Sequence, residues 1–358
     1  MRSLQRKHDH NFCFCSYVPP QVLENLARAG IKEAVLSINQ SKISREKRDL
    51  KDIKTDNFMM EFTSLESVGK ASRYVYDSKN SWMQRVDKPV RKEGGKAISD
   101  KTVNLVYDFV GDVREYFKKI HGRKSIDDAN MDLILNVHYG EKYQNAFWDG
   151  DEMTFGDGDG EIFVDFAKSL DVIAHELTHG VVQWEANLEY KGQPGALNEH
   201  FADVFGTVIT QWVEKQTAKN ADWLIGDEIM GPKLSGEALR SMIEPGTAYD
   251  NDLMGKDPQP SHMKDYYSGP DDNYGVHINS GIPNKVFYLV ANEMEIGTKD
   301  ASMIWYDALK NLWPTANFND AVKVIVRSAQ TLTEKKIVPK GSTQKVRAAF
   351  KEVGLPTT

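Results

Sequence analysis

The pattern of apolar and polar residues predicts a chain whose first half is rich in strands and whose second half is helical. Alternation with a period of two predicts strands at Ser72–Asp77, Asn130–Tyr143 and Gly160–Asp165. Apolar residues three and four positions apart predict a helix from Asp100 to Ile120. We therefore predict an α+β fold with a β-rich N-terminal lobe and an α-helical C-terminal lobe. The same helical spacing continues through 196–212, 284–294, 301–312, 320–332 and 344–353.

A histidine-containing motif lies where these two halves meet. Asp171–Gly180 contains His175, Glu176 and His179 in the order His-Glu-x-x-His. Positions i and i+4 of a helix share a face, so both imidazoles can reach one point, and two imidazole nitrogens suit a tetrahedral Zn²⁺. Glu176 would lie beside the metal and could accept a proton from metal-bound water. The motif favours a zinc hydrolase, although two surface histidines on an ordinary helix would give the same letters.

A second helix could supply the third metal ligand. Within Ala196–Trp212, Glu199 and Asp203 stand four positions apart, on the face opposite the apolar residues. A catalytic zinc site uses three protein ligands, so Glu199 is the candidate third ligand. Asp203 is the candidate acceptor that fixes the tautomer of a ligating histidine. A pair of solvated carboxylates on an exposed flank is the alternative interpretation.

Together these motifs resemble the thermolysin family of zinc metallopeptidases. The family order of His-Glu-x-x-His followed by Gly-Ala-Leu-Asn-Glu-x-x-x-Asp is matched in spacing. The resemblance implies a two-lobed thermolysin-like fold with the zinc helix between the lobes. It also implies a zinc-dependent neutral endopeptidase that acts on polypeptides. The implied zinc ligands are His175, His179 and Glu199, the implied general base is Glu176, and the implied partners of the ligands are Asn198 and Asp203.

Three further segments resemble the family. Gln144–Trp148, with Gly156–Gly160 after it, is similar to an edge strand and substrate-binding segment. There, Asn145 and the carbonyl of Ala146 would hold the substrate backbone. A single tyrosine, arginine or histidine is usually structural, and only its place in a matched motif gives it a role. By resemblance, Tyr190 and His277 would donate hydrogen bonds to the transition state, and Asp272 would orient His277. Arg240 would bind a substrate carbonyl.

The resemblance also assigns the pocket that receives the substrate residue just after the scissile bond. Its expected lining is entirely apolar, which predicts a preference for a large hydrophobic residue on this primed side of the bond. Bulky Phe166 would narrow the pocket, so the exact preference stays open. The expected lining residues are Phe163, Phe166, Val172, Ile225, Ile229 and Leu239.

The family pattern carries a calcium site as well, and the chain departs from it there. Asp171, Asp222 and Asp227 match expected ligands, whereas Thr210 and Leu224 stand where acidic ligands would be expected. Because Ca²⁺ takes about six to eight oxygen ligands, we expect a double site to be lost. Whether one calcium ion binds is left open.

Composition and charge narrow the functional class. The chain has 358 residues, 40% of them hydrophobic, which suffices for two lobes. Its net charge of −7 and the lack of a basic run with interleaved aromatics argue against nucleic-acid binding. No apolar stretch approaches the ~20 residues of a membrane-spanning helix. The basic N-terminus has no apolar region behind it, so we expect either a cytoplasmic protein or one secreted without a standard signal peptide.

Residues 1–66 are organised differently from the rest of the chain. Pro19-Pro20-Gln-Val-Leu resembles the short prosegment of the protealysin-like branch of the family, which implies an intramolecular inhibitor. Pro20 and Gly30 bracket a short amphipathic helix. The charged segment Ser44–Asp52 is either an exposed cleavage region or a solvated helix surface. The expected division is a prosegment at 1–66, an N-terminal catalytic lobe at 67–190 and a C-terminal catalytic lobe at 191–358.

The two cysteines and the completeness of the motifs bear on rival interpretations. Cys13 and Cys15 are too close in sequence for an unstrained disulfide, so we expect free thiols. A thiolate from either could instead bind the zinc and keep a precursor inactive, although small buried side chains explain the same residues.

A zinc-binding domain without activity would be favoured by loss of Glu176, Tyr190 or His277, and all three are present.

Overall fold

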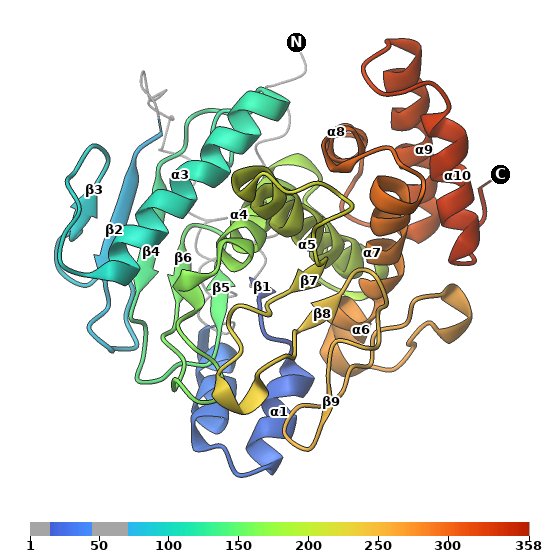
Figure 1. The fold of residues 1–358 in the computed structure, drawn as a ribbon. Helices are drawn as coiled ribbons and strands as arrows, with labels where there is room; N and C mark the ends of the chain where they lie inside the picture. The colour runs from blue at the N-terminus through green and yellow to red at the C-terminus, as the bar shows by residue number, and fades with distance from the viewer. Residues whose placement is uncertain (1–14, 45–70, 358) are drawn as a thin grey trace, which may run out of the picture.

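The computed structural model describes residues 15–44 and 71–357 and confirms the predicted α+β organisation. In Figure 1, the strands within residues 73–155 and helix α3 (Lys101–His121) lie on the left, and the C-terminal helices lie on the right. Helices α4 (Leu170–Glu185) and α5 (Gly192–Glu214) lie between them. None of the helices within these described residues is long and apolar enough to cross a membrane.

A six-stranded mixed sheet forms the N-terminal lobe, in the order β1-β5-β6-β4-β2-β3. Strand β1 comes from the start of the described chain and pairs antiparallel with β5, with Ser16 opposite Phe147. The sheet is therefore completed by a segment far away in sequence. The strands are β1 (Cys15–Ser16), β2 (Arg73–Asp77), β3 (Arg91–Lys92), β4 (Leu133–Val137), β5 (Ala146–Trp148) and β6 (Met153–Phe155).

Helix α3 covers this sheet and follows the predicted helical pattern closely. Asp100 caps its first turn, because the Asp100 carboxylate accepts a hydrogen bond from the amide of Val103 (3.1 Å). Gly122 ends the helix with a φ of 70°, a left-handed conformation that glycine adopts without strain. The apolar face that the sequence predicted, from Val103 to Phe117, is buried.

The predicted strand at Gly160–Asp165 is wrong. Only Phe163 forms a β-bridge there, to Met230, and the neighbouring backbone turns instead. The turn forms because Oδ1 of Asp159 accepts hydrogen bonds from the next two free amides, those of Glu161 and Ile162, at 2.8 Å each. An aspartate that binds its own downstream backbone competes with strand pairing, and apolar alternation alone does not reveal that competition.

The zinc-motif helix α4 and its neighbour α5 form the buried centre of the fold. They pack along one another, and α5 is also covered by α6, α7 and α8. Glu199 and Asp203 on α5 are both fully buried, so the alternative of a solvated carboxylate flank is wrong. Two ionisable side chains in such a place need partners that offset the loss of solvation.

The C-terminal lobe consists of helices with two small hairpins beside them. The sequence predicted one helix through 284–294, and the structure has α7 followed directly by a π-helical turn, η4. The helices are α6 (Asp271–Asn279), α7 (Gly281–Tyr288), η4 (Leu289–Glu293), α8 (Thr298–Leu309), α9 (Phe318–Glu334) and α10 (Ser342–Glu352). The short elements are η1 (Phe166–Lys168), β7 (Leu224–Ile225), η2 (Pro232–Leu234), β8 (Arg240–Ser241), β9 (Asp250–Asn251), β10 (Gly255–Lys256) and η3 (Met263–Asp265).

The N-terminal segment, which we define as residues 15–44, lies against both lobes (Figure 1, blue). It continues from β1 into α1 (Pro20–Arg28), the predicted short helix, and then into a helical stretch at 32–44. The side chain of Asn25 donates a hydrogen bond to the carbonyl of Met254 (2.7 Å), in the β9–β10 hairpin. The rest of the charged segment beyond residue 44 and the expected boundary near residue 66 lie outside the described residues.

The expectation of free thiols is wrong for Cys15, which is disulfide-bonded. The strain of a short ring argued against a disulfide, but a cross-link can still form when its stability exceeds that strain. Cys15 therefore offers no thiolate to a metal, and position 13 lies outside the described residues.

A charged cluster of Asp100, His138 and Asp157 joins the residue that caps α3 to the turn at Asp157. Nε2 of His138 lies 3.0 Å from Asp100, and Nδ1 lies 2.9 Å from Asp157. Both ring nitrogens face carboxylates, so both donate when the ring is protonated. The hydrogen bond with Asp157 favours the charged ring, partial burial opposes it, and the further attraction of Asp157 and Asp100 raises the pKa of His138 to about 9.

This cluster predicts a pH-dependent contribution to stability. Because the folded-state pKa lies above the ordinary value of about 6.5, the contribution is full below that pH and is lost as the pH rises through about 9. We expect His138→Asn to lower the free energy of unfolding by about 2 kcal/mol near pH 6, and by little near pH 10. Denaturant unfolding in a Glu176→Gln background, which prevents self-digestion, measures this. His262→Asn, at a histidine outside the cluster, is the control, and a deficit that is constant with pH would contradict the prediction.

Candidate metal centre

Three buried side chains from α4 and α5 converge on one point. Nε2 of His175 lies 3.0 Å from Nε2 of His179, and the two oxygens of Glu199 lie 3.5 Å from these nitrogens. Among the residues described, this is the one group of three or more His, Cys, Asp or Glu side chains whose ligand atoms all lie within 4.8 Å of each other. A tetrahedral ion with bonds of about 2.0–2.1 Å needs donors separated by about 3.3 Å. The donor set therefore fits Zn²⁺.

Each histidine is held by a hydrogen bond from its other ring nitrogen. Nδ1 of His175 donates to Asp203 (3.0 Å), and Nδ1 of His179 donates to Asn198 (2.8 Å). These bonds leave both Nε2 atoms free to accept a metal. A histidine pair without such acceptors could rotate away from the shared point. The two residues that the sequence proposed beside the ligands thus lie where that role requires them.

The carboxylate of Asp203 is itself fixed by two further groups. Nε and Nη2 of Arg240 donate to its two oxygens (2.9 and 2.8 Å), and the amide of Asn284 donates to Oδ2 (2.9 Å). Burial alone would raise the pKa of Asp203, but the charge of Arg240 and the bond with His175 outweigh it and hold that pKa far below its usual range. The sequence did not suggest Asn284, which lies in no recognised motif.

Glu176 lies close to Glu199, with its carboxylate buried. The backbone of Trp148 approaches this carboxylate and lowers its pKa, but no donor among the described residues meets either oxygen at full hydrogen-bond distance and angle. Burial and the charge of Glu199 raise the pKa of Glu176 well above its usual value. A buried carboxylate left without donors points to a missing polar species, such as water or a substrate.

Two potential hydrogen-bond donors, Tyr190 and His277, lie beside Glu199. The hydroxyl of Tyr190 donates to Glu199 and lies 3.2 Å from Nε2 of His277, whose Nδ1 donates to Asp272 (2.6 Å). Burial opposes a charged ring here, but Glu199 and Asp272 outweigh it and raise the pKa of His277 to about 9. Residues 272–275 adopt left-handed backbone angles, which turn the Asp272 carboxylate back onto the amide of His277 (2.7 Å).

Comparison with known proteins identifies the family. The model described as thermolysin metallopeptidase, catalytic domain, matches residues 30–183. The model described as thermolysin metallopeptidase, alpha-helical domain, matches residues 186–355. The chain belongs to the thermolysin family of metallopeptidases. It is thus a zinc-dependent metalloendopeptidase, as its motifs implied.

Individual relatives support the same assignment. An extracellular metalloprotease of Pectobacterium carotovorum is 42% identical over 85% of this chain and 87% of its own length. Protease PrtS of a Photorhabdus strain is 43% identical over 74% of this chain and 72% of its own. The solved precursor of protealysin from Serratia proteamaculans is 38% identical and superposes with a TM-score of 0.82, covering 96% of this chain and 100% of that chain. This thermolysin-family chain is accordingly a precursor of the protealysin-like kind.

In this thermolysin-family chain, the N-terminal segment crosses the metal centre in extended form. The amide of Tyr17 donates to the carbonyl of Ala146 (3.1 Å), and Val18 exchanges hydrogen bonds with the side chain of Asn145 (2.8 and 3.3 Å). Nε2 of His277 donates to the carbonyl of Ser16 (3.0 Å). The sequence did not single out these three residues, although the prolines after Val18 do hold that residue in extended conformations.

Arg240 touches this segment as well as Asp203. Its Nη1 donates to the carbonyl of Tyr17 at 3.4 Å, while its other two donor groups hold Asp203. The sequence assigned Arg240 to a substrate carbonyl, and the structure shows a backbone carbonyl of the chain itself in that contact. The guanidinium of Arg240 therefore links Asp203, which accepts a hydrogen bond from His175, to the backbone carbonyl of Tyr17.

The six residues expected to line the primed-side pocket are all buried. Leu239 lies beside Gly226, and its amide donates to the carbonyl of Ile225 (2.9 Å). The rings of Phe163 and Phe166 pack with centroids 5.7 Å apart, just before α4. Tyr17 lies among these elements, because its side chain is close to His175 of α4, to Arg240 of β8 and to Gly226 next to β7.

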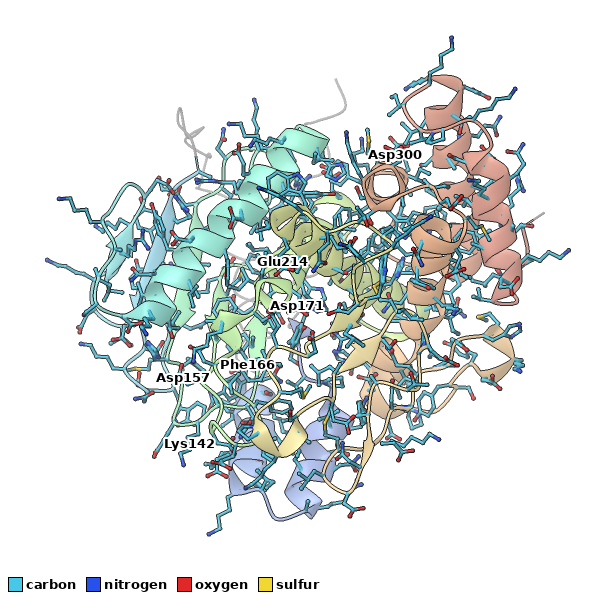
Figure 2. The ribbon with its side chains drawn as sticks, in the orientation of Figure 1. Lys142, Asp157, Phe166, Asp171, Glu214 and Asp300 are labelled. Atoms are coloured by element: carbon cyan, nitrogen blue, oxygen red, sulfur yellow. The ribbon has the colours of Figure 1, made fainter. Side chains whose placement is uncertain are left out.

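The candidate calcium residues gather beside the metal centre. Asp171, Asp222 and Asp227 line a pocket of about 50 Å³ together with Thr210 and Leu224. Figure 2 labels Asp171 near the centre of the molecule, close to Glu214 of the same pocket. Burial, with the charges of Asp171 and Asp222, raises the pKa of Asp227 to about 6. In the described part of the chain, the three aspartates do not bring their oxygens within 4.8 Å of one another.

Proposed function

We propose that this metalloendopeptidase cleaves polypeptides before large hydrophobic residues, with Glu176 as general base. The observation that carries the proposal is the convergence of His175, His179 and Glu199, with the buried carboxylate of Glu176 close to Glu199 and held by no side-chain donor of the described residues. These three residues would hold one Zn²⁺, which when bound supplies the Lewis acidity that polarises a peptide carbonyl and acidifies water.

The chain's own groups would then move the proton and hold the substrate. Glu176 accepts a proton from the attacking water and later gives it to the leaving amine. Tyr190 and His277 donate hydrogen bonds to the oxygen that gains negative charge, and Asp272 orients His277 for that role. The spacing of these donors around Glu199 supports this assignment, because both hydroxyl and imidazole already face the same side of the site.

The contacts of the N-terminal segment support the substrate-binding roles. Asn145 and the carbonyl of Ala146 hold its backbone, as an incoming peptide would be held beside an edge strand. Arg240 reaches a carbonyl of the same segment. The buried apolar residues around the primed side favour a large hydrophobic side chain there.

The same contacts support an inhibitory role for the N-terminal segment. Ser16, Tyr17 and Val18 fill the groups that a substrate would use, so we propose that this segment is an intramolecular inhibitor of the precursor. Further contacts hold the segment in place, including Gln40 with the hydroxyl of Tyr139 (2.9 Å). A tethered inhibitor acts at a high effective concentration and needs only moderate contacts.

A calcium ion is a separate part of the proposal. We propose that the pocket of Asp171, Asp222 and Asp227 binds at most one Ca²⁺. The carboxylates and their mutual repulsion favour a cation, whereas Thr210 and Leu224 provide no carboxylate where a fuller site would have one.

Replacement of the proposed general base tests the mechanism. We expect Glu176→Gln to lower kcat/KM for casein-derived peptides by at least about 10³-fold while zinc content stays the same, because Glu176 is not among the convergent donors. Zinc removal by a chelator should abolish wild-type cleavage, and added zinc should restore it. Glu161→Gln, at an exposed glutamate, is the control. A zinc-loaded Glu176→Gln enzyme with near wild-type activity would remove Glu176 from the mechanism.

Removal of one backbone donor tests inhibition by the N-terminal segment. Val18→Pro deletes the amide that donates to Asn145, so the segment should bind the site less tightly. We expect intact Val18→Pro precursor to hydrolyse a short peptide about 5–10-fold faster than intact wild-type precursor. Mass spectrometry verifies that both chains are uncleaved. Lys32→Ala, at an exposed lysine of the same segment, should change nothing, and equal activity of all three precursors would argue against inhibition by this segment.

Calcium dependence can be tested within the same chain. Mild calcium chelation should lower the melting temperature of the wild type less than that of Thr210→Glu/Leu224→Glu, since the double variant restores two carboxylates to the pocket. Thermal scans in a Glu176→Gln background provide the comparison. Equal losses of melting temperature in both proteins would contradict the proposal of a reduced site.

A further inference from the structure

The side chain of Tyr17 is buried between the metal centre and Asp171. Tyr17 is fully buried, and its ring meets that of His175 edge to face, with centroids 5.0 Å apart. The guanidinium of Arg240 lies 5.4 Å from the centre of the same ring. At the far end, the phenol hydroxyl donates to Oδ2 of Asp171 (3.0 Å). A pocket whose expected lining is apolar thus has a carboxylate at its floor.

This carboxylate is held so that one oxygen faces the pocket. The hydroxyl of Ser169 donates to Oδ1 of Asp171, and the amide of Gly226 donates to Oδ2 (2.7 Å). A phenol keeps its proton at neutral pH, so the hydroxyl of Tyr17 donates and the carboxylate of Asp171 accepts. Donor and acceptor therefore have fixed roles in this contact.

Gly226 leaves room for the phenol oxygen. Its φ is +74°, and a Cβ at this position would lie 3.1 Å from the hydroxyl of Tyr17 and equally close to Leu239. Any larger residue would crowd the floor of the pocket at the point where the hydroxyl meets Asp171. The floor is thus shaped for a ring that carries one polar atom at its tip.

The backbone register places Tyr17 in the position of a substrate residue. Its amide donates to Ala146, its carbonyl accepts from Arg240, and the preceding carbonyl of Ser16 accepts from His277. In the proposed mechanism, His277 faces the carbonyl that is attacked. Tyr17 then stands where the residue immediately after the scissile bond would stand.

We propose that Asp171 makes this pocket selective for tyrosine at the residue just after the scissile bond. The proposal rests on the proposed function and narrows its preference for large hydrophobic residues. A phenylalanine in the same place would leave a small void and would remove one donor from a buried carboxylate. Sites built to hydrogen-bond a substrate hydroxyl reject analogues that lack it more strongly than apolar pockets reject a small change in size.

Paired peptides provide the test. The full chain is allowed to mature with zinc bound and is given two peptides that differ only in tyrosine or phenylalanine after the cleaved bond, which mass spectrometry locates. We expect kcat/KM to be at least about 10-fold higher for the tyrosine peptide. Asp171→Asn should reduce this ratio several-fold. Asp222→Asn, in the same acidic pocket but without a hydrogen bond to Tyr17, should leave the ratio unchanged and so controls for lost calcium.

The outcomes separate this inference from the proposed function. Equal rates for the two peptides in the wild type would overturn tyrosine selection and leave the peptidase intact, whereas no cleavage of either peptide by zinc-loaded enzyme would reject the proposed function. If Asp171→Asn does not fold, Tyr17→Phe in the intact precursor gives a second measurement. That precursor should hydrolyse a short peptide about 10-fold faster than the intact wild-type precursor, and unchanged latency would overturn the inference.

Discussion

The buried carboxylate of Asp203 is the group on which the arrangement of the site depends. It accepts from His175, from Arg240 and from Asn284, and these three come from α4, β8 and α7. A charge without solvent is tolerable only when such partners surround it, so the three elements are held in one arrangement by a single requirement. The position of a metal-site histidine and the position of an arginine that binds backbone carbonyls are therefore not independent.

Much of the fold could be predicted from the sequence because the residues that begin, continue and end its helices lie within the helices or next to them. Helix α3 has an aspartate cap, a regular apolar face and a terminal glycine, and all three are local features. The donors on α4 and α5 were predictable for a related reason, since a spacing of four residues fixes their direction once the helices form. What the sequence alone could not give is the distance between the two helices.

The features that were missed depend on contacts between distant residues or on the competition between side chains and backbone. The segment 160–165 has strand-like alternation, but Asp159 binds the following amides and forms a turn. Strand β1 pairs with β5 across more than a hundred residues, and no local sequence pattern predicts such a pairing. The hydrogen bond between Tyr17 and Asp171 was missed for the same reason, because the two residues lie more than a hundred positions apart in the sequence.

Strand β1 also determines whether the sheet has an open edge at β5. While β1 is present, the backbone of β5 has a partner on its outer side. Loss of the N-terminal segment would convert β5 into an open edge with unpaired amides and carbonyls, the kind of surface that most proteins protect. In a metalloendopeptidase such an open edge is useful, because an extended chain can complete the sheet through its backbone. Discrimination among sequences then falls to the side-chain pockets beside the edge, whereas the edge, Asn145 and Arg240 contact backbone groups that every peptide carries.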